Sequence, residues 1–586
     1  MDIQRTILWS VFGLSLILLW ERWQMYQART TMPPPAVTAP APNAPAAVAR
    51  APGEIPTPNA QASAPAAAAS PPPAVAAAGA QRVKVRTDVI WAELDPMGAT
   101  LVRVELPTQK ISPDWTEQGL ARLLGLTDFL HAHGIGHATG ALHGDAHMVL
   151  LDTSAGHIYQ AQTGLIGGPP GSPFPNHGAT LFEAAPGPRV LGDGQDTLAV
   201  RFEAQSGGVR LVKTFTFRRG HFDIKVEHEI TDVGNDAVSP SLYLQLVRDG
   251  SSAGDDSYFA RSYTGPAFYS DIDKYRKISF EDIDKGKADD LKPAEDGWVA
   301  VVQHYFVSAW VPPSAIRREY YALDRDHLYS AGALLKLGTL AAGAKTSLAS
   351  TLYVGPQDQR TLESIAPELD RVADYGKLTP IAKPLFWLLG WLHQLVGNWG
   401  WAIVLLTVLI KAVFYPLSAA SYKSMAKMKE LQPKMAKLRE QHGEDRQKLQ
   451  LAMMELYKQE KINPLMGCLP VLVQIPVFIS LYWVLLASVE MRNAPWMLWI
   501  RDLATPDGWF VLPIVMMASM WIQYKLNPTP PDPVQAKMMA IMPFIFGAMF
   551  FFFPAGLVLY WVVNNVLSIL QQWRISRVVA RAKPAG

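Results

Sequence analysis

Residues 401–417 read WAIVLLTVLIKAVFYPL, an apolar stretch typical of a membrane-spanning helix with one charge, Lys411, inside it. A cation near the centre of such a helix costs about 3 kcal/mol on insertion scales and usually marks a function. No metal-ligand pair, nucleophile–base pair or phosphate-binding loop accompanies it in the apolar part of the sequence. We therefore predict that Lys411 holds water or meets a polar client within the bilayer, and that it does not act as a catalytic group.

Working outward, the sequence after Pro384 predicts a bundle of five membrane spans. They cover residues 401–417, 468–486, 509–524, 538–553 and 557–570. Several are near or below the roughly 20 residues that cross a hydrocarbon core, so we expect locally thinned lipid around them. The shorter aromatic segment 386–396 contains His393 and Gln394 and predicts an amphipathic helix at the membrane interface.

A further apolar segment, residues 7–20, predicts a sixth span near the amino terminus. A signal peptide was the alternative, but Glu21 and Arg22 follow where a cleavage site needs small residues, so an uncleaved anchor is favoured. Residues 33–80 are mostly Pro and Ala and predict an extended spacer. Ten Lys and Arg residues in 422–461 and the basic residues after 573 place both regions in the cytoplasm by the positive-inside rule. Six spans then leave both termini inside.

The middle of the chain predicts a large β domain. Between residues 83 and 354, runs such as TLVRVEL, TLAVRFEA, VRLVKTFTFRR and GWVAVVQHYFVSAWV alternate apolar and polar residues between turn signals, which favours a sandwich. Residues 363–375 predict a helix leading back to the membrane. The single cysteine, Cys468, excludes an internal disulfide, and a formal net charge of only +2 argues against bulk nucleic-acid binding.

The β domain contains histidines and carboxylates that are candidates for a metal-binding or enzyme site. The histidines are His131, His133, His137, His143 and His147. Their spacing matches no recognised metal-ligand frame, and their Gly-rich context predicts a solvated insertion loop. The carboxylates Asp255, Asp256, Asp271 and Asp273 lie in polar loops and are interpreted as solvated surface.

The spans themselves carry more polar residues than packing requires. Thr407 and Lys411 share a helix face, Gln474 lies in another span, and Asn564, Asn565 and Ser568 lie in the last. Interhelical hydrogen bonds worth about 0.6 kcal/mol each are one explanation for the uncharged residues. For the charge of Lys411, another explanation is that its side chain snorkels to the cytoplasmic end of the helix, about 9 Å away. Together the residues predict a wet groove open toward the cytoplasm.

The cytoplasmic loop predicts two amphipathic helices folded as a hairpin, with apolar residues spaced by three and four in 425–438 and again in 449–457. Pro433 is expected to kink or interrupt the first helix. Most of the apolar stripe is expected to pack within the hairpin. Its methionines leave some adaptable surface for unlike partners.

Three long motifs resemble one family. They are TVLIKAVFYPLSAASYKSMAKMKELQPKMAKLRE, LYKQEKINPLMGCLPVLVQIPVFISLY and FFPAGLVLYWVVNNVLSILQQW. They look like the YidC-type membrane protein insertases, and the long β domain is similar to the Gram-negative form, whose domain is a supersandwich with sugar-binding relatives. The resemblance covers nearly the whole chain except the Pro/Ala spacer and the His-rich loop. It implies an insertase that admits segments of new membrane proteins into a hydrophilic groove and releases them into lipid, alone or beside the Sec translocon.

The resemblance also implies site residues. Lys411 stands where the family generally has an arginine, so the planar fork of donors is lost while the charge is kept. Thr407 shares its face, and Tyr560 and Trp561 are expected to face it from the last span. The predicted groove and client-contact residues are Lys411, Thr407, Gln474, Ile475, Pro476, Phe478, Tyr560, Trp561 and Asn564.

The predicted fold class is mixed: a polytopic α-helical membrane bundle of six spans, five of them forming the core, plus a large all-β supersandwich-like periplasmic domain. The expected bounds are an anchor 1–25, linker 26–82, β domain with a C-terminal helix 83–380, interfacial helix 381–398, second span 399–417, cytoplasmic hairpin 418–465, third span 466–488, periplasmic loop 489–508, fourth span 509–525, cytoplasmic loop 526–536, fifth span 537–553, sixth span 555–573 and basic tail 574–586.

The predicted function is a non-enzymatic insertase and chaperone of the bacterial inner membrane, with no cofactor or metal. Expected partners are nascent membrane protein clients, Sec translocon components and the lipid bilayer, with the ribosome and targeting factors as candidates for the hairpin and tail, and no nucleic-acid specificity. A transporter or channel with a periplasmic sensor domain was the alternative, and an anchored envelope enzyme or carbohydrate binder a third. The outer halves of the spans are aromatic and aliphatic, so they offer no polar path through the membrane and disfavour the transporter or channel.

Overall fold

A computed structural model describes residues 81–581, apart from 113, 133–146, 155–156, 179, 252–262, 289, 443–445, 461–468 and 528–532. Residues 1–50 and 51–586 form two compact units, and the first unit lies wholly outside the described residues. The predicted anchor and nearly all of the predicted linker therefore lie outside them too. So do His133, His137, His143, Asp255, Asp256 and Cys468.

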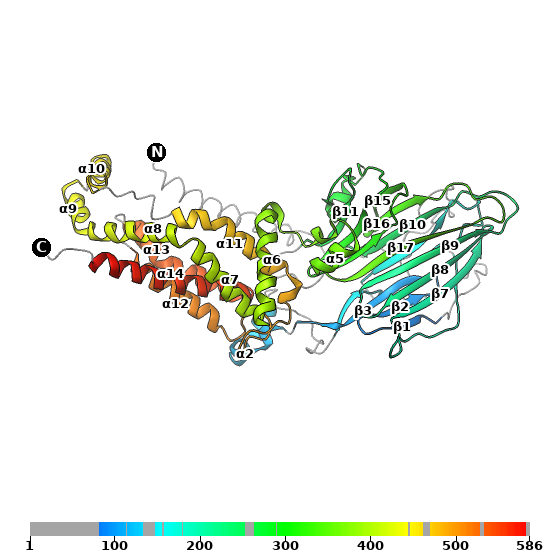
Figure 1. The fold of residues 1–586 in the computed structure, drawn as a ribbon, viewed down its shortest axis with the longest axis horizontal. Helices are drawn as coiled ribbons and strands as arrows, with labels where there is room; N and C mark the ends of the chain where they lie inside the picture. Colours follow the sequence, from blue (N-terminus) through cyan, green and yellow to red (C-terminus); the bar gives the residue numbers. More distant parts are fainter. Residues whose placement is uncertain are drawn as a thin grey trace, which may run out of the picture. The chain divides into compact units, whose positions relative to one another are not determined.

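The β domain is built on two antiparallel sheets. The first sheet has the spatial order β1 (Val83–Arg86), β2 (Trp91–Asp95), β3 (Thr100–Lys110), β5 (Tyr159–Ile166), β10 (Ser241–Asp249), β16 (Leu328–Lys336) and β15 (Arg318–Arg325), with β4 (His147–Leu151) paired to β3. The second has the order β12 (Arg276–Lys277), β11 (Gly265–Tyr269), β13 (Trp298–Gln303), β14 (Phe306–Val311), β17 (Lys345–Pro356), β9 (Asp223–Asp232), β8 (Val209–Arg218), β7 (Thr197–Ser206) and β6 (Glu183–Ala184). Strands β17, β9, β8 and β7 run side by side in Figure 1.

The two sheets share one apolar core, which supports the predicted sandwich. Leu101 and Leu244 of the first sheet belong to the same buried cluster as Phe215, Val226 and Leu352 of the second. The alternation of apolar and polar residues in strands such as β7 places one set of side chains in this core and the other at the surface.

Two hairpins depart from the sequence prediction. The run 297–311, read as one strand, is a hairpin of β13 and β14 that turns at His304 and Tyr305. The hairpin of β15 and β16 was missed, because β16 is almost continuously buried and shows no alternation. Its turn residues Asp326 and His327 both have positive φ, 54° and 63°, as a type I′ turn requires, but lack the Asn-Gly signal that usually announces one.

The predicted helix 363–375 is also different. It begins earlier, as α5 (Gln359–Ile365), because Asp358 caps it by accepting a hydrogen bond from the Thr361 backbone amide at 2.8 Å. After Pro367 the chain continues as the short helix η2 (Leu369–Val372). Leu362 of α5 and Leu369 of η2 pack on Trp298 and Tyr353 of the second sheet. These two elements therefore cover the face of that sheet opposite to the shared core.

Part of the predicted insertion loop is structured. Between β3 and β4 lie η1 (Trp115–Glu117), α2 (Gly119–Leu123) and α3 (Thr127–Ala132), so His131 is in a helix and His147 begins a strand. A second small helix of the domain is α4 (Phe280–Asp284). The expectation of a wholly irregular His-rich loop was therefore wrong at both of its ends.

The remaining described residues form a helical bundle (Figure 1). Its elements are α6 (Thr379–Val396), α7 (Trp399–Val413), α8 (Tyr415–Glu430), α9 (Gln432–His442), α10 (Arg446–Gln459), α11 (Leu469–Ala487), η5 (Val489–Met491), α12 (Val511–Leu526), α13 (Pro533–Met549), η6 (Phe550–Phe552) and α14 (Ala555–Arg581), with η3 (Gly376–Leu378) preceding α6. Its apolar core joins α6, α7, α11, α12 and α14 through residues such as Leu389, Ile403, Val484, Met516 and Val558.

No single helix among the described residues is both long and apolar enough by itself to cross a membrane. The pair α7 and α8 passes that test together, although the two helices are bent by 67°. Three shorter apolar helices cover Leu472–Ala487, Val511–Leu526 and Ala536–Phe552. The number of spans therefore stays a prediction.

Several helix ends differ from the predicted segments. The segment 399–417 divides at Phe414, because Pro416 begins a new helix and cannot continue the hydrogen-bond ladder of α7. At the other end of the bundle, α14 runs to Arg581, so most of the predicted tail is helical. In the hairpin predicted to be cytoplasmic, α9 begins beside Pro433, and Leu431 and Met435 pack against Met453 and Leu456 of α10.

Candidate functional site

Lys411 lies in the last turn of α7 and is only 5% exposed. Its Nζ donates a hydrogen bond of 2.8 Å to Ser568 Oγ on α14, and Ser568 Oγ in turn donates to the Asn564 carbonyl at 2.7 Å. An ammonium group has three donors. A single neutral hydroxyl is therefore the one hydrogen-bond partner found for this buried cation among the described residues.

Thr407 lies one turn before Lys411 and is also buried. Its hydroxyl donates to the carbonyl of Ile403 at 2.7 Å, within its own helix. This bond satisfies the hydroxyl without any neighbouring helix. Thr407 therefore contributes a small, polar surface beside Lys411 but does not bond to it.

The last helix presents a polar stripe with the spacing of a helix face. Asn564, Ser568 and Gln572 recur every four residues and are all buried. Gln572 Nε2 donates to Asn527 Oδ1 at 3.1 Å, and the neighbouring Asn565 donates to Ser519 Oγ of α12 at 3.1 Å. The stripe therefore meets α7 at Ser568 and the end of α12 at Gln572, and the neighbouring Asn565 adds a second bond to α12.

Some buried polar atoms of the bundle have no hydrogen-bond partner among the described residues. These are Gln474 Nε2 on α11, the Tyr560 hydroxyl, Gln571 Oε1 and Gln572 Oε1 on α14. Leaving such an atom unsatisfied costs about 1–3 kcal/mol, so native interiors contain few of them. Polar atoms of this kind are suited to bind water or the polar groups of a client.

Tyr560 and Trp561 lie in an aromatic cluster rather than beside Lys411. The Phe478 ring of α11 stacks on Trp561 at 5.0 Å and meets Tyr560 edge-on at 5.8 Å. Tyr560 precedes Ser568 by eight residues, which is about 12 Å along a helix. The expectation that both aromatic residues face Lys411 is therefore not met in this structure.

The predicted residues thus divide into groups. Lys411 bonds to Ser568, whose hydroxyl bonds to the backbone carbonyl of Asn564 within α14, while Phe478, Tyr560 and Trp561 form the aromatic cluster. On α11, Gln474 is buried, Pro476 is half-buried and Ile475 is exposed, so the three point to different surroundings. Sequence reasoning saw Ser568 as polar but did not pair it with Lys411, and it missed Gln572, although the spacing of four could have shown both.

These polar side chains are enclosed in the structure. Lys411, Gln474 and Asn564 are each less than a tenth exposed. Ser418 and Ser421 of α8 are buried as well, and α8 packs against α11 and α14. The groove open toward the cytoplasm therefore stays a prediction.

The β domain has a buried polar group of a different kind. Lys213 of β8 donates 2.6 Å hydrogen bonds to the carbonyls of Gly98 and Thr163, and its Nζ lies 4.6 Å from the centre of the Phe182 ring. His228, its direct neighbour on β9, shares a 2.9 Å hydrogen bond between Nε2 and Thr163 Oγ1. Burial lowers the pKa of Lys213 to about 7 and that of His228 to about 3. Thr163 thus links the two sheets through polar bonds inside the core.

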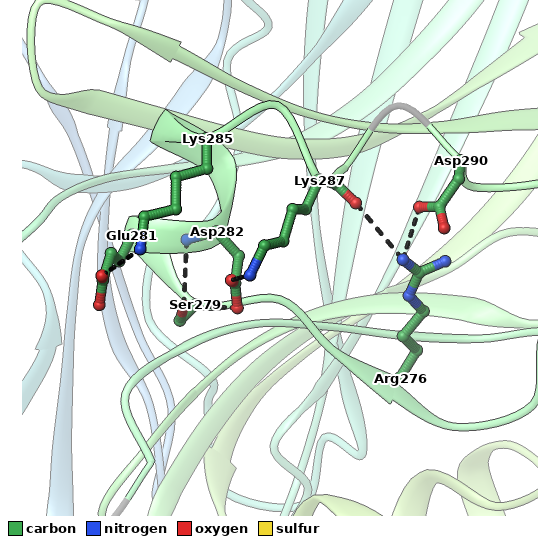
Figure 2. Close-up of polar contacts among 7 residues, drawn as sticks. All are labelled: Arg276, Ser279, Glu281, Asp282, Lys285, Lys287 and Asp290. Atoms are coloured by element: carbon green, nitrogen blue, oxygen red, sulfur yellow. Dashed lines mark hydrogen bonds and ion pairs between the residues drawn. The ribbon is translucent and has the colours of Figure 1, made fainter.

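The charged residues near α4 form exposed ion pairs, as Figure 2 shows. Arg276 meets Asp290 at 2.5 Å, Lys287 meets Asp282 at 2.6 Å and Lys285 pairs with Glu281. The hydrogen bond from Lys287 lowers the pKa of Asp282 to about 2. General acids need raised pKa values, so this cluster is better suited to hold a loop than to transfer protons.

Metal binding finds no support in the part of the chain that is described. No group of three or more His, Cys, Asp or Glu side chains there is placed to hold an ion. His147 instead lies 2.9 Å from Glu105 through Nδ1 and meets the Trp91 ring edge-on.

The chain matches two protein-family models. Residues 391–582 match the family described as 60Kd inner membrane protein, and residues 136–388 match the YidC periplasmic domain. Among curated proteins, the membrane protein insertase YidC of Bordetella avium (strain 197N) is 52% identical over 99% of both chains. The same insertase of Cupriavidus necator (strain H16) is 51% identical over 100% of this chain and 99% of its own length.

Among solved structures, an active YidC insertase with its first transmembrane domain resolved matches with a TM-score of 0.37 and 17% identity, over 83% of this chain and 91% of its own. A galactose mutarotase-like protein from Lactobacillus casei matches with a TM-score of 0.26 and 11% identity, over 47% of this chain and all of its own.

The sequence matches and the described folds define an inner-membrane protein with a helical core and a β-rich periplasmic domain. The chain belongs to the YidC family of membrane protein insertases. Its activity is the insertion of proteins into the membrane.

Proposed function

We propose that the polar interior of the bundle receives the polar outer segment of a client while the client's apolar span passes into lipid. The observation that supports this most directly is the buried Lys411, bonded only to Ser568 among the described residues. Its remaining donors can meet water or a client carboxylate. The step is one of binding and release and forms no covalent bond, so we propose that the activity is not enzymatic.

Client entry requires that the polar interior be uncovered, and α8 is the element best placed to do this. It follows α7 after a 67° bend at Phe414 and packs on α11 and α14. Movement of α8 about that bend would expose Ser568 and Lys411 toward the cytoplasm. The same helix leads into the hairpin of α9 and α10, which a client or ribosome would meet first.

The drive for insertion comes from the client. A polar outer segment crosses the hydrocarbon core at lower free energy when hydrogen-bonding groups and water meet it partway, and its apolar span then gains favourable contact with lipid. A cation in the path favours acidic segments in particular. Lys411 provides this attraction as a point charge, without the fixed donor geometry of an arginine.

Protease protection tests the proposal. Liposomes carrying the full-length protein receive a single-span client with an acidic outer tail, and the protected fraction is compared for wild type, Lys411→Leu and Lys411→Arg. We expect at least a tenfold lower initial rate for Lys411→Leu and near wild-type rates for Lys411→Arg. Lys525→Leu, which removes an exposed cation from the end of α12, is the matched control and should leave the rate unchanged.

Equal protection by wild type and Lys411→Leu would contradict the role of this charge. A client with a neutral tail sharpens the test, because the difference between the two proteins should shrink when the carboxylates are removed. A variant that loses both clients equally would instead indicate damage to the bundle.

The basic cytoplasmic surfaces are proposed to contact the ribosome and targeting factors. The last turns of α14 carry Arg574, Arg577 and Arg581. The Arg577 guanidinium lies 3.8 Å from the centre of the Trp573 ring. On α10, Leu451 and Met454 are exposed and add apolar surface. Charge contacts of this kind are weakened by salt. Cosedimentation with ribosomes should therefore fall steeply between 50 and about 200 mM salt and fall again in a variant with the three arginines replaced by glutamine.

The finer topology and the Sec contact are also proposed. Six spans with both termini in the cytoplasm follow from the basic residues of 422–461 and of the carboxyl terminus. Accessibility of single cysteines in these regions to a membrane-impermeant reagent tests the topology. Site-specific crosslinking to Sec translocon components in intact membranes tests the partnership.

A further inference from the structure

The segment between β3 and β4 carries a helical insert whose role the insertase activity does not explain. Its described part comprises η1, α2 and α3, and it lies outside both ranges matched by the family models. We propose that α2 and α3 form a foot that rests in the lipid interface at the periplasmic end of the bundle.

The insert is bound directly to the start of α12. The backbone amides of Leu120 and Ala121 donate to the Gly508 carbonyl at 2.9 and 3.2 Å. The approach requires two glycines: a Cβ on Gly119, whose φ is +56°, would lie 2.6 Å from that carbonyl oxygen, and one on Gly508 would lie 2.7 Å from the Trp115 carbonyl oxygen. This contact fixes the insert at the level of one end of the bundle.

Aromatic packing strengthens the same attachment. The Trp115 ring meets Phe510, which precedes α12, and Phe552, which ends η6, edge-on at 6.3 and 6.4 Å. Leu130 of α3 joins the same buried cluster. Phe510 and Phe552 adjoin α12 and α13, two of the short apolar helices, so the insert lies where those helices end.

The insert exposes large apolar side chains that lie within seven residues of one another in the sequence. Leu123 is 73% exposed, Leu124 60% and Phe129 60%. In the β domain proper, exposed apolar residues such as Leu181, Val190, Val233 and Ile272 are far apart in the sequence. Isolated residues of that kind are normal, whereas a concentration of them marks an interaction surface.

Lipid is the occupant that the surroundings favour. Trp509 precedes α12 and is exposed, and Ile514 and Val515 in its first turns are exposed too, so an apolar surface extends along the chain from α12 to the residue next to the attachment point. In a protein of the inner membrane, lipid covers the exposed apolar face of such a helix, and tryptophan is typical of its interface. The foot continues this surface.

The expected binding is apolar rather than ionic. Residues 115–132 contain Glu117, Arg122 and Asp128 as their charged residues, so the segment has no basic surplus for anionic headgroups. Leucine and phenylalanine side chains that enter the interface gain by leaving water. A foot of this kind would hold the first sheet at a fixed height above the membrane, because β3 leads directly into it.

Fluorescence quenching in the full-length protein tests the proposal. In a Cys468→Ser background, which leaves no other cysteine, Leu124→Cys is labelled with a small fluorophore and the protein is placed in lipid nanodiscs. Ile272→Cys, with a similar exposed fraction of 56%, is the matched control, and Leu123→Cys is a second position on the foot. Each probe is quenched by lipids with a nitroxide near the headgroup and, separately, by iodide at constant ionic strength.

We expect lipid quenching at residues 123 and 124 to exceed that at 272 at least twofold, and iodide quenching to be at least threefold weaker. Equal iodide quenching at all three positions would overturn the proposal, because the foot would then be in water. Protection from iodide without lipid quenching would also overturn it and would show that protein, either a partner or a second copy, covers the foot. Lipid quenching that persists at high salt supports apolar binding.

Discussion

The β domain and the helical bundle each bury a lysine, and the two are held differently. Lys213 donates to two backbone carbonyls at 2.6 Å and lies over the Phe182 ring, whereas Lys411 donates to one hydroxyl at 2.8 Å. The first lysine joins strands of both sheets, so its donors are used by the fold. The second keeps donors that the described fold does not use, which is what a binding residue requires.

The neighbours of the two lysines differ less than the lysines themselves. His228 beside Lys213 bonds to Thr163 through Nε2, but its Nδ1 has no partner among the described residues, as is true of one polar atom each in Gln474, Tyr560 and Gln572 of the bundle. The comparison therefore rests on the two ammonium groups. A donor that the fold uses helps to specify that fold, whereas an unused donor is available for binding.

The largest expected effect is on the stability of the β domain. Lys213→Met leaves the Gly98 and Thr163 carbonyls without their donor, and each buried unsatisfied group costs about 1–3 kcal/mol. We expect the free energy of unfolding to fall by about 3 kcal/mol at about pH 10.5, where the cost of burying the Lys213 ammonium is nearly absent, measured by denaturant titration of the purified protein followed through its tryptophan fluorescence. Insertion per folded molecule should not change. A loss of less than about 0.5 kcal/mol would contradict the conclusion that Lys213 stabilises the β domain.

Next in size is the effect of Lys411→Leu, with the opposite pattern. Insertion of the acidic-tailed client should fall about tenfold, equivalent to about 1.4 kcal/mol in the barrier. The free energy of unfolding should stay within about 1 kcal/mol of wild type or rise, because a leucine suits this apolar helix. If both lysine variants lose stability but not activity, the two residues play the same structural part.

A smaller effect is expected from pH, and in the β domain it arises at His228. The pKa of His228 is lowered from its ordinary 6.5 to about 3, so the unfolded chain binds a proton in this window that the folded chain does not. The His228 contribution to stability is then fully present above pH 6.5 and is lost as pH falls toward 3. Between pH 6.5 and 5.5 this contribution should fall by about 1 kcal/mol. Burial raises the pKa of Glu490 to about 7, so Glu490 acts in the opposite direction over the same window, and the His228 contribution has to be isolated with a variant.

His228→Gln keeps a hydrogen-bonding group near Thr163 but does not titrate. On going from pH 6.5 to 5.5, its free energy of unfolding should therefore change by about 1 kcal/mol less unfavourably than that of wild type, measured by the same denaturant titration. The pKa of Lys213 is lowered to about 7, so its contribution to stability rises as pH increases from 7 to 10.5. Lys213→Met should remove this rise. Identical pH profiles for wild type and both variants would refute the assignment of these windows.

The smallest expected effect is that of Ser568→Ala. It removes the described partner of Lys411 but keeps the charge, so the lysine should be less well positioned and insertion should fall about twofold to threefold, as one weak hydrogen bond predicts. Ser519→Ala, which removes the partner of Asn565 on α12, is the control and should leave insertion unchanged. A tenfold loss for Ser568→Ala would mean that the hydroxyl itself contacts the client.

Sequence reasoning reached the β sandwich because its strands alternate clearly where one face is buried, as in β7. It missed the hairpin of β15 and β16 because β16 is buried on both faces and loses that alternation, and because Asp326 and His327 form the turn without glycine. In the bundle, the composition marked apolar segments well, but the division at Phe414 depended on Pro416 and on the packing of α8 over α14.

By itself, the sequence determined the family of this protein, the β-rich and helical halves, and the unusual position of Lys411, because composition, periodicity and long motifs are local properties of a chain. Only the tertiary structure decided that Ser568 is the partner of Lys411, that Tyr560 and Trp561 pack on Phe478, and that Lys213 and His228 meet at Thr163. Those contacts join segments up to 157 residues apart. Their geometry follows from how whole sheets and helices pack, which no short stretch of sequence contains.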